Sequence, residues 1–167
     1  IDLARHELFS MANCELGAEG EVIKRKGSAK LNSSELVTNK TVTGCGKQRF
    51  SASSSETFAF CATKFYSDID GTPTDRTGSV TITEDDDKTW VSFDAGGTML
   101  SCNGNGNDPM LKWASASGNL AAADVDSRFT SAGVGAWFDN RAWFGDVNTG
   151  EDRVWRSSNT DIGSWGA

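Results

Sequence analysis

After residue 17, the chain alternates short apolar or β-branched runs with turns rich in Gly, Asp, Asn and Ser. Residues 57–61 and 89–93 are such runs, and their aromatic and β-branched side chains favour strands. Several short strands separated by turns are typical of a β-sandwich or a barrel. The pattern therefore predicts a mainly β protein, with a β-sandwich in its C-terminal half.

Residues 2–16 carry the one strong helical pattern. Asp2 is placed to cap the start of a helix, Gly17 to end it, and Cys14 lies in the last turn. The residues at helical spacing on one face are Ile1, Ala4, Leu8, Met11 and Ala12. We expect this N-terminal helix to pack on a small disulfide-bonded sheet.

The segment 67–79 is rich in Asp, Gly and Thr and contains Pro73, as is typical of a linker. It predicts a boundary between a helix-led β subdomain, residues 1–72, and a β-sandwich subdomain, residues 73–167.

Hairpins are the expected local structure of the second subdomain. Residues 80–83 and 89–93 flank an acidic turn, and residues 136–138 and 142–144 flank another turn. A turn at 94–97 leads into a strand at 98–102, whereas residues 120–123 fit a short helix or a loop.

The four cysteines are widely spaced, without the C-x-x-C of a zinc or redox site. An even cysteine count in a Gly- and Ser-rich chain indicates an oxidising compartment and two disulfides. Four cysteines allow three connectivities; our expectation is Cys14–Cys45 with Cys61–Cys102. Sequons at Asn32 and Asn39 agree with secretion to the extracellular space.

The net charge of −7 and the pI near 4.7 disfavour nucleic acid, because an acidic surface repels phosphate backbones. No apolar run is long enough to span a membrane. We expect a monomer with neither of these partners and without a cofactor.

The sequence offers few candidate catalytic residues. His6 is the only histidine, so nucleophilic hydrolysis with a histidine base is disfavoured and no catalytic residue is assigned. Asp139 and Asp146, beside two tryptophans, would be the best carboxylate pair for a glycosidase.

Oxygen-rich turns raise the possibility of a calcium ion. Asp68 with Asp70, and Asp146 with Asn148 and Asp152, alternate as calcium ligands do. Both segments lack the full calcium-loop pattern, and Asp and Asn also dominate ordinary turns. We therefore assign no metal.

All six tryptophans lie after residue 89. Adjacent residues of a strand point to opposite faces, so one member of each Trp-Phe doublet must face away from its sheet's core side. The candidate binding surface comprises Trp137, Phe138, Trp143, Phe144 and Trp155.

A helix ending at Cys14, strands carrying Cys45 and Cys61, and a Trp-rich sheet after Ser79 resemble secreted effectors of plant-pathogenic fungi. More narrowly, this organisation is similar to the two-domain secreted-in-xylem effectors of Fusarium. The resemblance implies a secreted, non-enzymatic virulence protein that binds, or is recognised by, host proteins. The alternatives are a lectin-like glycan-binding module and a small carboxylate-dependent glycosidase.

Overall fold

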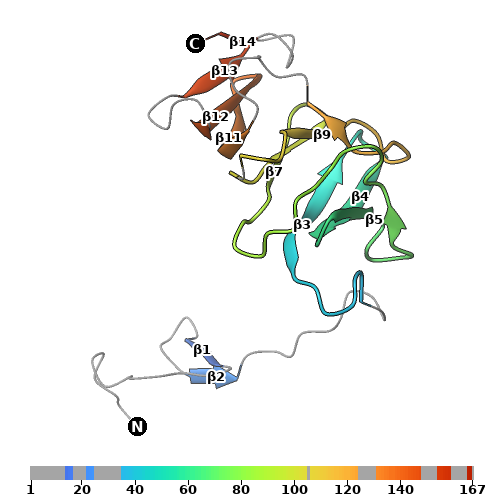
Figure 1. Ribbon diagram of the computed structural model, residues 1–167. Coiled ribbons are helices and arrows are strands. Elements are labelled where there is room, and N and C mark those ends of the chain that lie inside the picture. Colours follow the sequence, from blue (N-terminus) through green and yellow to red (C-terminus); the bar gives the residue numbers. More distant parts are fainter. Residues whose placement is uncertain are drawn as a thin grey trace. The chain divides into compact units, whose positions relative to one another are not determined.

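The computed structural model describes residues 35–104, 106–123, 131–147 and 154–158. It also gives the backbone of three short strands outside these ranges: β1 (Cys14–Leu16), β2 (Val22–Lys24) and β14 (Trp165–Gly166). The chain divides into two compact units, Ile1–Leu31 and Asn32–Ala167 (Figure 1).

In the first unit, β1 and β2 form an antiparallel hairpin in which Glu15 lies opposite Ile23. The predicted helix over residues 2–16 is therefore wrong at its C-terminal end, and no helix occurs among the described residues. Pairing with the β-branched Val22 and Ile23 overrides the helical spacing of the preceding residues. The rest of that predicted helix, including His6, lies outside the described residues.

The second unit contains three successive four-stranded antiparallel sheets, and in each sheet the strands follow chain order (Figure 1). We call them the first, second and third sheets. The first contains β3 (Val42–Arg49), β4 (Ser55–Cys61), β5 (Lys64–Ser67) and β6 (Thr74–Asp75). The second contains β7 (Val91–Asp94), β8 (Met99–Cys102), β9 (Leu111–Trp113) and β10 (Ala121–Ala122). The third contains β11 (Ala132–Phe138), β12 (Arg141–Val147), β13 (Trp155–Ser157) and β14.

Two predicted turns are confirmed. Asp139 and Asn140 join β11 to β12 with φ of 52° and 55°, the left-handed conformation that a two-residue hairpin turn requires. Between β7 and β8, the Gly97 amide donates to Asp94 Oδ1 at 2.6 Å and the Ala95 amide to the Thr98 carbonyl at 2.7 Å.

Two other expectations about local structure are wrong. Residues 80–83 form no strand, so the expected hairpin with residues 89–93 does not form. Instead, β7 pairs with β8, the strand that follows it. Ile82 is nevertheless buried between the sheets, which explains why this segment alternates like a strand. Residues 120–123 contain the short strand β10, where a helix or loop was expected.

The segment 67–79 also contains regular structure. Its β6 pairs with β5, and the Arg76 amide donates to the Phe65 carbonyl at 2.8 Å. The Arg76 carbonyl in turn accepts from the Leu120 amide at 2.7 Å. The subdomain boundary between residues 72 and 73 stays a prediction.

The second sheet has a packed core on each of its two faces. One face packs on the first sheet, and the opposite face packs on the third sheet. The first of these cores includes Phe58, Phe60, Phe65, Ile82, Trp90, Met99, Leu111, Trp113 and Leu120. The other includes Ala95, Leu100, Cys102, Met110, Ala132, Ala142, Phe144, Val147 and Trp155. The fold is thus β-rich with packed sheets, and the described residues contain none of the helix-on-sheet packing that was expected of the N-terminal half.

The predicted disulfides are wrong, because Cys45, Cys61 and Cys102 are free thiols. Cys61 follows Phe60 on β4 and so points away from the second sheet, whereas Cys102 points toward the third. The two sulfurs therefore lie in different layers and cannot pair. Cys45 is exposed and unpaired, and the side chain of Cys14 lies outside the described residues.

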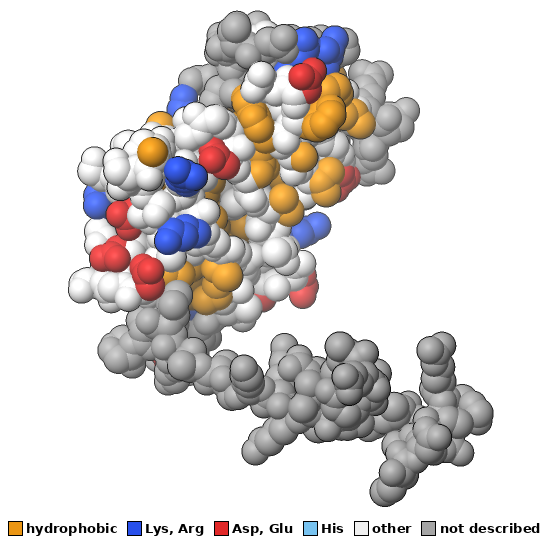
Figure 2. All heavy atoms as spheres, turned by 180° about the vertical axis from the view of Figure 1, so that it is seen from behind, with side chains coloured by type: hydrophobic (Ala, Val, Ile, Leu, Met, Phe, Trp, Pro, Cys, Tyr) orange, Lys and Arg blue, Asp and Glu red, His pale blue; other side chains and the backbone are white. Residues whose placement is uncertain are grey.

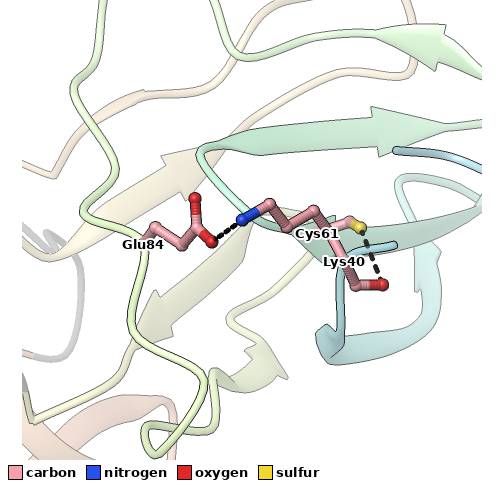
Figure 3. A network of polar contacts seen from close by, with 3 residues as sticks. All are labelled: Lys40, Cys61 and Glu84. Atoms are coloured by element: carbon pink, nitrogen blue, oxygen red, sulfur yellow. Dashed lines mark hydrogen bonds and ion pairs between the residues drawn. The ribbon is translucent and has the colours of Figure 1, made fainter. Parts of the chain in front are cut away.

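The buried thiols have local explanations. The Cys61 thiol donates to the Lys40 carbonyl at 3.9 Å, and the Lys40 ammonium pairs with the Glu84 carboxylate (Figure 3). Burial raises the pKa of the Cys61 thiol, and it raises the pKa of Cys102 to about 12. Both thiols therefore stay protonated at neutral pH, which makes them poor nucleophiles.

Candidate binding surface on the third sheet

The β11–β12 hairpin separates the two members of each Trp-Phe doublet. Trp137 and Phe144 point toward the second sheet, where Phe144 is buried in the core and Trp137 packs against it. Phe138 and Trp143 point to the opposite side, and Phe138 is 71% exposed. This is the division that strand alternation predicted.

We call the side of the third sheet that faces away from the second sheet its outer face. Among the described residues, four large hydrophobic side chains are exposed, and three of them occur here: Val134 at 55%, Phe138 at 71% and Val154 at 63%. Val154 directly precedes β13, where the next residue, Trp155, faces the core. Figure 2 shows exposed hydrophobic side chains in a band across the described part of the second unit. An apolar group of this kind marks an interaction surface more often than a scattered residue does.

Trp143 is held in place on this outer face. Its indole Nε1 donates to the Phe138 carbonyl at 3.1 Å, which ties the ring to the hairpin end. The Arg156 guanidinium lies over the ring, 5.9 Å from its centroid, within range of a cation–π interaction. A ring fixed before binding loses little further conformational entropy when a partner covers it.

Two arginines bring positive charge to the outer face, although the chain is acidic overall. Arg156 lies opposite Trp143 in the register, and Arg141 lies opposite Phe138. The Nε of Arg141 is buried and has no hydrogen-bond partner. A buried guanidinium N–H without a partner is costly, so an acceptor supplied by a ligand would stabilise it.

The five predicted surface residues thus divide between two environments. Trp155 and Phe144 are buried in the core, Trp137 is half-buried against it, and Phe138 and Trp143 lie on the outer face. Sequence reasoning did not identify Val134, Val154, Arg141 and Arg156 as parts of the same face. The period-two alternation along β11 and β12 could have placed Val134 and Arg141 on this face.

The best carboxylate pair for a glycosidase is separated too widely. Asp139 lies in the hairpin turn, and Asp146 lies near the other end of β12. Seven residues of extended chain span about 23 Å at 3.3 Å per residue, whereas glycosidase carboxylates lie about 5–10 Å apart. The Asp146 carboxylate also faces Gly133, on the side of the second sheet.

The oxygen-rich turn at Asp68, which was considered for calcium but not assigned a metal, has its carboxylates hydrogen-bonded within the chain. Asp68 Oδ2 accepts from the Thr72 amide at 3.2 Å, and Asp70 Oδ1 accepts from the Thr57 hydroxyl. The described part of the chain has no group of three or more His, Cys, Asp and Glu side chains that could hold a metal ion. Asn148 and Asp152 lie outside the described residues.

No family model, no curated protein and no solved structure matches the chain. None of the described residues forms a helix that could span a membrane. What the chain binds must therefore follow from the chemistry of its own surface.

Proposed function

We propose that the chain is a non-enzymatic binding module that holds a partner protein on the outer face of its third sheet. The observation that carries this proposal is the 71% exposure of Phe138 beside the immobilised ring of Trp143. Large aromatic side chains and arginine are enriched among residues that dominate protein–protein binding energies, and both occur here.

A protein partner suits this face better than a glycan does. Sugar rings stack on open aromatic faces, but one side of the Trp143 ring is covered by Arg156. Beside the exposed ring of Phe138, the exposed groups Val134 and Val154 are aliphatic and offer a sugar no hydrogen bond. An apolar centre with arginines beside it instead fits an apolar protein side chain with acidic neighbours.

The biological setting of this binding is a separate proposal. The resemblance to fungal effectors supports a secreted protein whose partner belongs to a plant host. The two disulfides that favoured secretion are absent, and Cys14 lies in a strand instead of at the end of a helix. Secretion therefore rests on the other features of that resemblance and on the sequons at Asn32 and Asn39.

The test begins with capture of proteins from a plant extracellular extract, followed by titration of the purified partner. We expect Phe138→Ala to weaken binding by more than about 1 kcal/mol, or roughly fivefold in Kd. Val134→Ala on the outer face should also weaken it. The matched control is Val42→Ala on β3, because Val42 has a similar exposure of 47%.

Equal affinities of wild type and Phe138→Ala for every captured protein would contradict the proposal. If the wild-type chain binds a glycan on an array and Phe138→Ala does not, the partner of this face is a carbohydrate and not a protein. Equal losses from Val134→Ala and Val42→Ala would mean that the binding surface is not confined to the third sheet.

A further inference from the structure

The first strands of the first and second sheets, β3 and β7, are both edge strands. Each pairs with a neighbour on one side only, β3 with β4 and β7 with β8. The opposite edge of each strand therefore presents backbone N–H and C=O groups that no strand of the described chain pairs. Such an edge is a template for an added strand.

The two strands are held near each other at both ends. At one end, Gly97 in the turn after β7 lies against the Phe50 carbonyl that follows β3, where a Cβ atom would be 2.9 Å from the oxygen. The other end has a hydrogen bond. The Trp90 amide, just before β7, donates to the Thr43 carbonyl of β3 at 2.8 Å. Gly44 makes this approach possible, because a Cβ atom there would lie 2.7 Å from the Trp90 Cβ. Beyond this contact the strands do not pair with each other.

Between the two strands lies a groove of about 430 Å³. At its floor, Phe58 and Trp90 present small apolar surfaces, being 3% and 6% exposed, whereas Met99 lines the groove without exposed surface. The rest of its lining comes from β3 and β7: Cys45, Gly46, Lys47, Gln48, Val91, Ser92, Phe93 and Asp94. None of these residues belongs to the outer face of the third sheet, so the groove is a separate site.

The length of the groove suits a short extended peptide. Residues 45–48 of β3 line it, and four residues of strand span about 13 Å. A peptide of that length could pair with an edge strand while alternate side chains enter the apolar floor. Recognition by strand addition uses these two elements, backbone hydrogen bonds and side-chain pockets.

Charge selects among such peptides. Lys47 lines the groove, and it also lines an adjoining hollow at the β3–β4 hairpin together with Arg49. On the opposite wall, the Asp94 carboxylate already accepts a hydrogen bond from the Gly97 amide at 2.6 Å. Asp94 keeps its negative charge on that wall. The charged side chains of β3 itself, Lys47 in the groove and Arg49 in the adjoining hollow, are both cationic, and they complement an acidic side chain.

We propose that this groove binds an extended acidic peptide segment, which adds as a strand to the free edge of β3. This activity goes beyond partner binding on the third sheet and does not depend on it. The peptide places apolar side chains over Phe58 and Trp90, and it places carboxylates beside Lys47 and Arg49.

The probe is a six-residue peptide of alternating valine and glutamate, acetylated and amidated at its ends. Titration of the full chain, followed by amide chemical shifts, should give a Kd below about 1 mM with the largest shifts in β3 and β7. A valine–lysine peptide of the same length should bind at least about tenfold more weakly. Alternate backbone N-methylation of the first peptide should also cost about tenfold, because it removes two or three hydrogen bonds.

Matched variants separate the groove from other cationic sites. Lys47→Glu should weaken the acidic peptide about tenfold and strengthen the lysine peptide. Lys88→Glu makes the same charge change at an exposed lysine that does not line the groove, and it should leave Kd unchanged. Phe138→Ala should also leave it unchanged, which keeps this test independent of the third sheet.

Three results would overturn the proposal. The first is no saturable shift in β3 or β7 at millimolar peptide. The second is equal affinity for the N-methylated peptide, which would exclude strand addition. The third is an equal loss of affinity for the acidic peptide in Lys47→Glu and Lys88→Glu. The loss would then come from the net charge of the chain and not from the groove.

Discussion

The second sheet packs against the first sheet mainly through contacting aromatic rings, and against the third sheet through a mixture of rings, aliphatic side chains and alanines. Toward the first sheet, the Phe60 and Trp90 rings stack at 4.5 Å, and Trp113 meets Phe65 edge to face at 5.0 Å. Toward the third sheet, the Phe93 and Phe144 ring centroids lie 5.5 Å apart, and the same core contains Leu100, Met110 and Trp155 beside three buried alanines. Interlocking rings fill space with side chains, whereas small residues fill it by close approach of backbones.

This difference explains where aromatic side chains remain exposed. In the first interface the large rings are needed for the core and are buried. In the third sheet, Gly135 and Ala142 occupy core-facing positions, which brings the backbone close to the second sheet. The aromatic residues Phe138 and Trp143 on its other face are not needed to hold the sheets together, so they are available for binding.

The largest expected effect is in the aromatic interface. Trp113→Ala removes a fully buried ring that contacts Phe50, Phe58 and Phe65, and should lower the free energy of unfolding by about 3–5 kcal/mol. It also leaves the Gly118 carbonyl without the Trp113 Nε1 donor, now at 2.9 Å. Urea unfolding followed by far-UV circular dichroism measures the change. A loss below about 1 kcal/mol would mean that the ring interface is not the main core.

The next effect tests close approach at the other interface. Gly135→Ala would place a Cβ atom 2.4 Å from Phe93 Cε1 and 2.8 Å from Phe144 Cε1. Overpacking of this kind should destabilise the protein by about 1–3 kcal/mol in the same unfolding experiment. Gly106→Ala is the matched control, because a Cβ there meets nothing within 4 Å. Equal stability of the two variants would show that the third sheet can shift away at no cost.

The sequence predicted the parts of this fold that depend on local chemistry. Asp139-Asn140 identifies a two-residue turn because both residues tolerate positive φ, and the alternation around it separated Phe138 from Phe144. The turn at 94–97 and the strands after it followed from Gly96 and Gly97 in the same way.

The sequence did not predict features that depend on distant partners. Residues 80–83 alternate like a strand because Ile82 is buried, but their backbone has no strand beside it. The cysteine count suggested disulfides, yet which sheet face each sulfur occupies is decided only by packing. The groove between β3 and β7 is lined by residues more than forty positions apart, so no local sequence pattern predicts it.

A smaller effect concerns Cys102, which is buried in the interface between the second and third sheets. Burial raises the pKa of this thiol from 9.0 to about 12 in the folded protein. Between these pH values the unfolded chain loses a proton that the folded chain keeps, so stability is full below pH 9 and falls as pH rises. We expect wild type to lose up to about 1.4 kcal/mol per pH unit more than Cys102→Ala in unfolding at pH 8–10.5.

The comparison between variants is necessary because Cys61 and Tyr66 also have pKa values raised by burial. Their contribution is common to wild type and Cys102→Ala and cancels in the difference. Identical pH slopes of the two proteins would mean that water reaches the thiol, and thus that the third sheet opens readily from the second.

The smallest expected change in stability is at Phe138. Its ring is 71% exposed on the outer face, so Phe138→Ala removes little buried area and should alter the free energy of unfolding by less than about 0.5 kcal/mol. Phe144→Ala makes the same chemical change at a buried position of the same hairpin, and should cost about 3–5 kcal/mol. Parallel urea titrations of the two variants measure the contrast directly. A large loss in Phe138→Ala would place its ring in a packed core, and an apolar group that stabilises the fold would no longer indicate a partner.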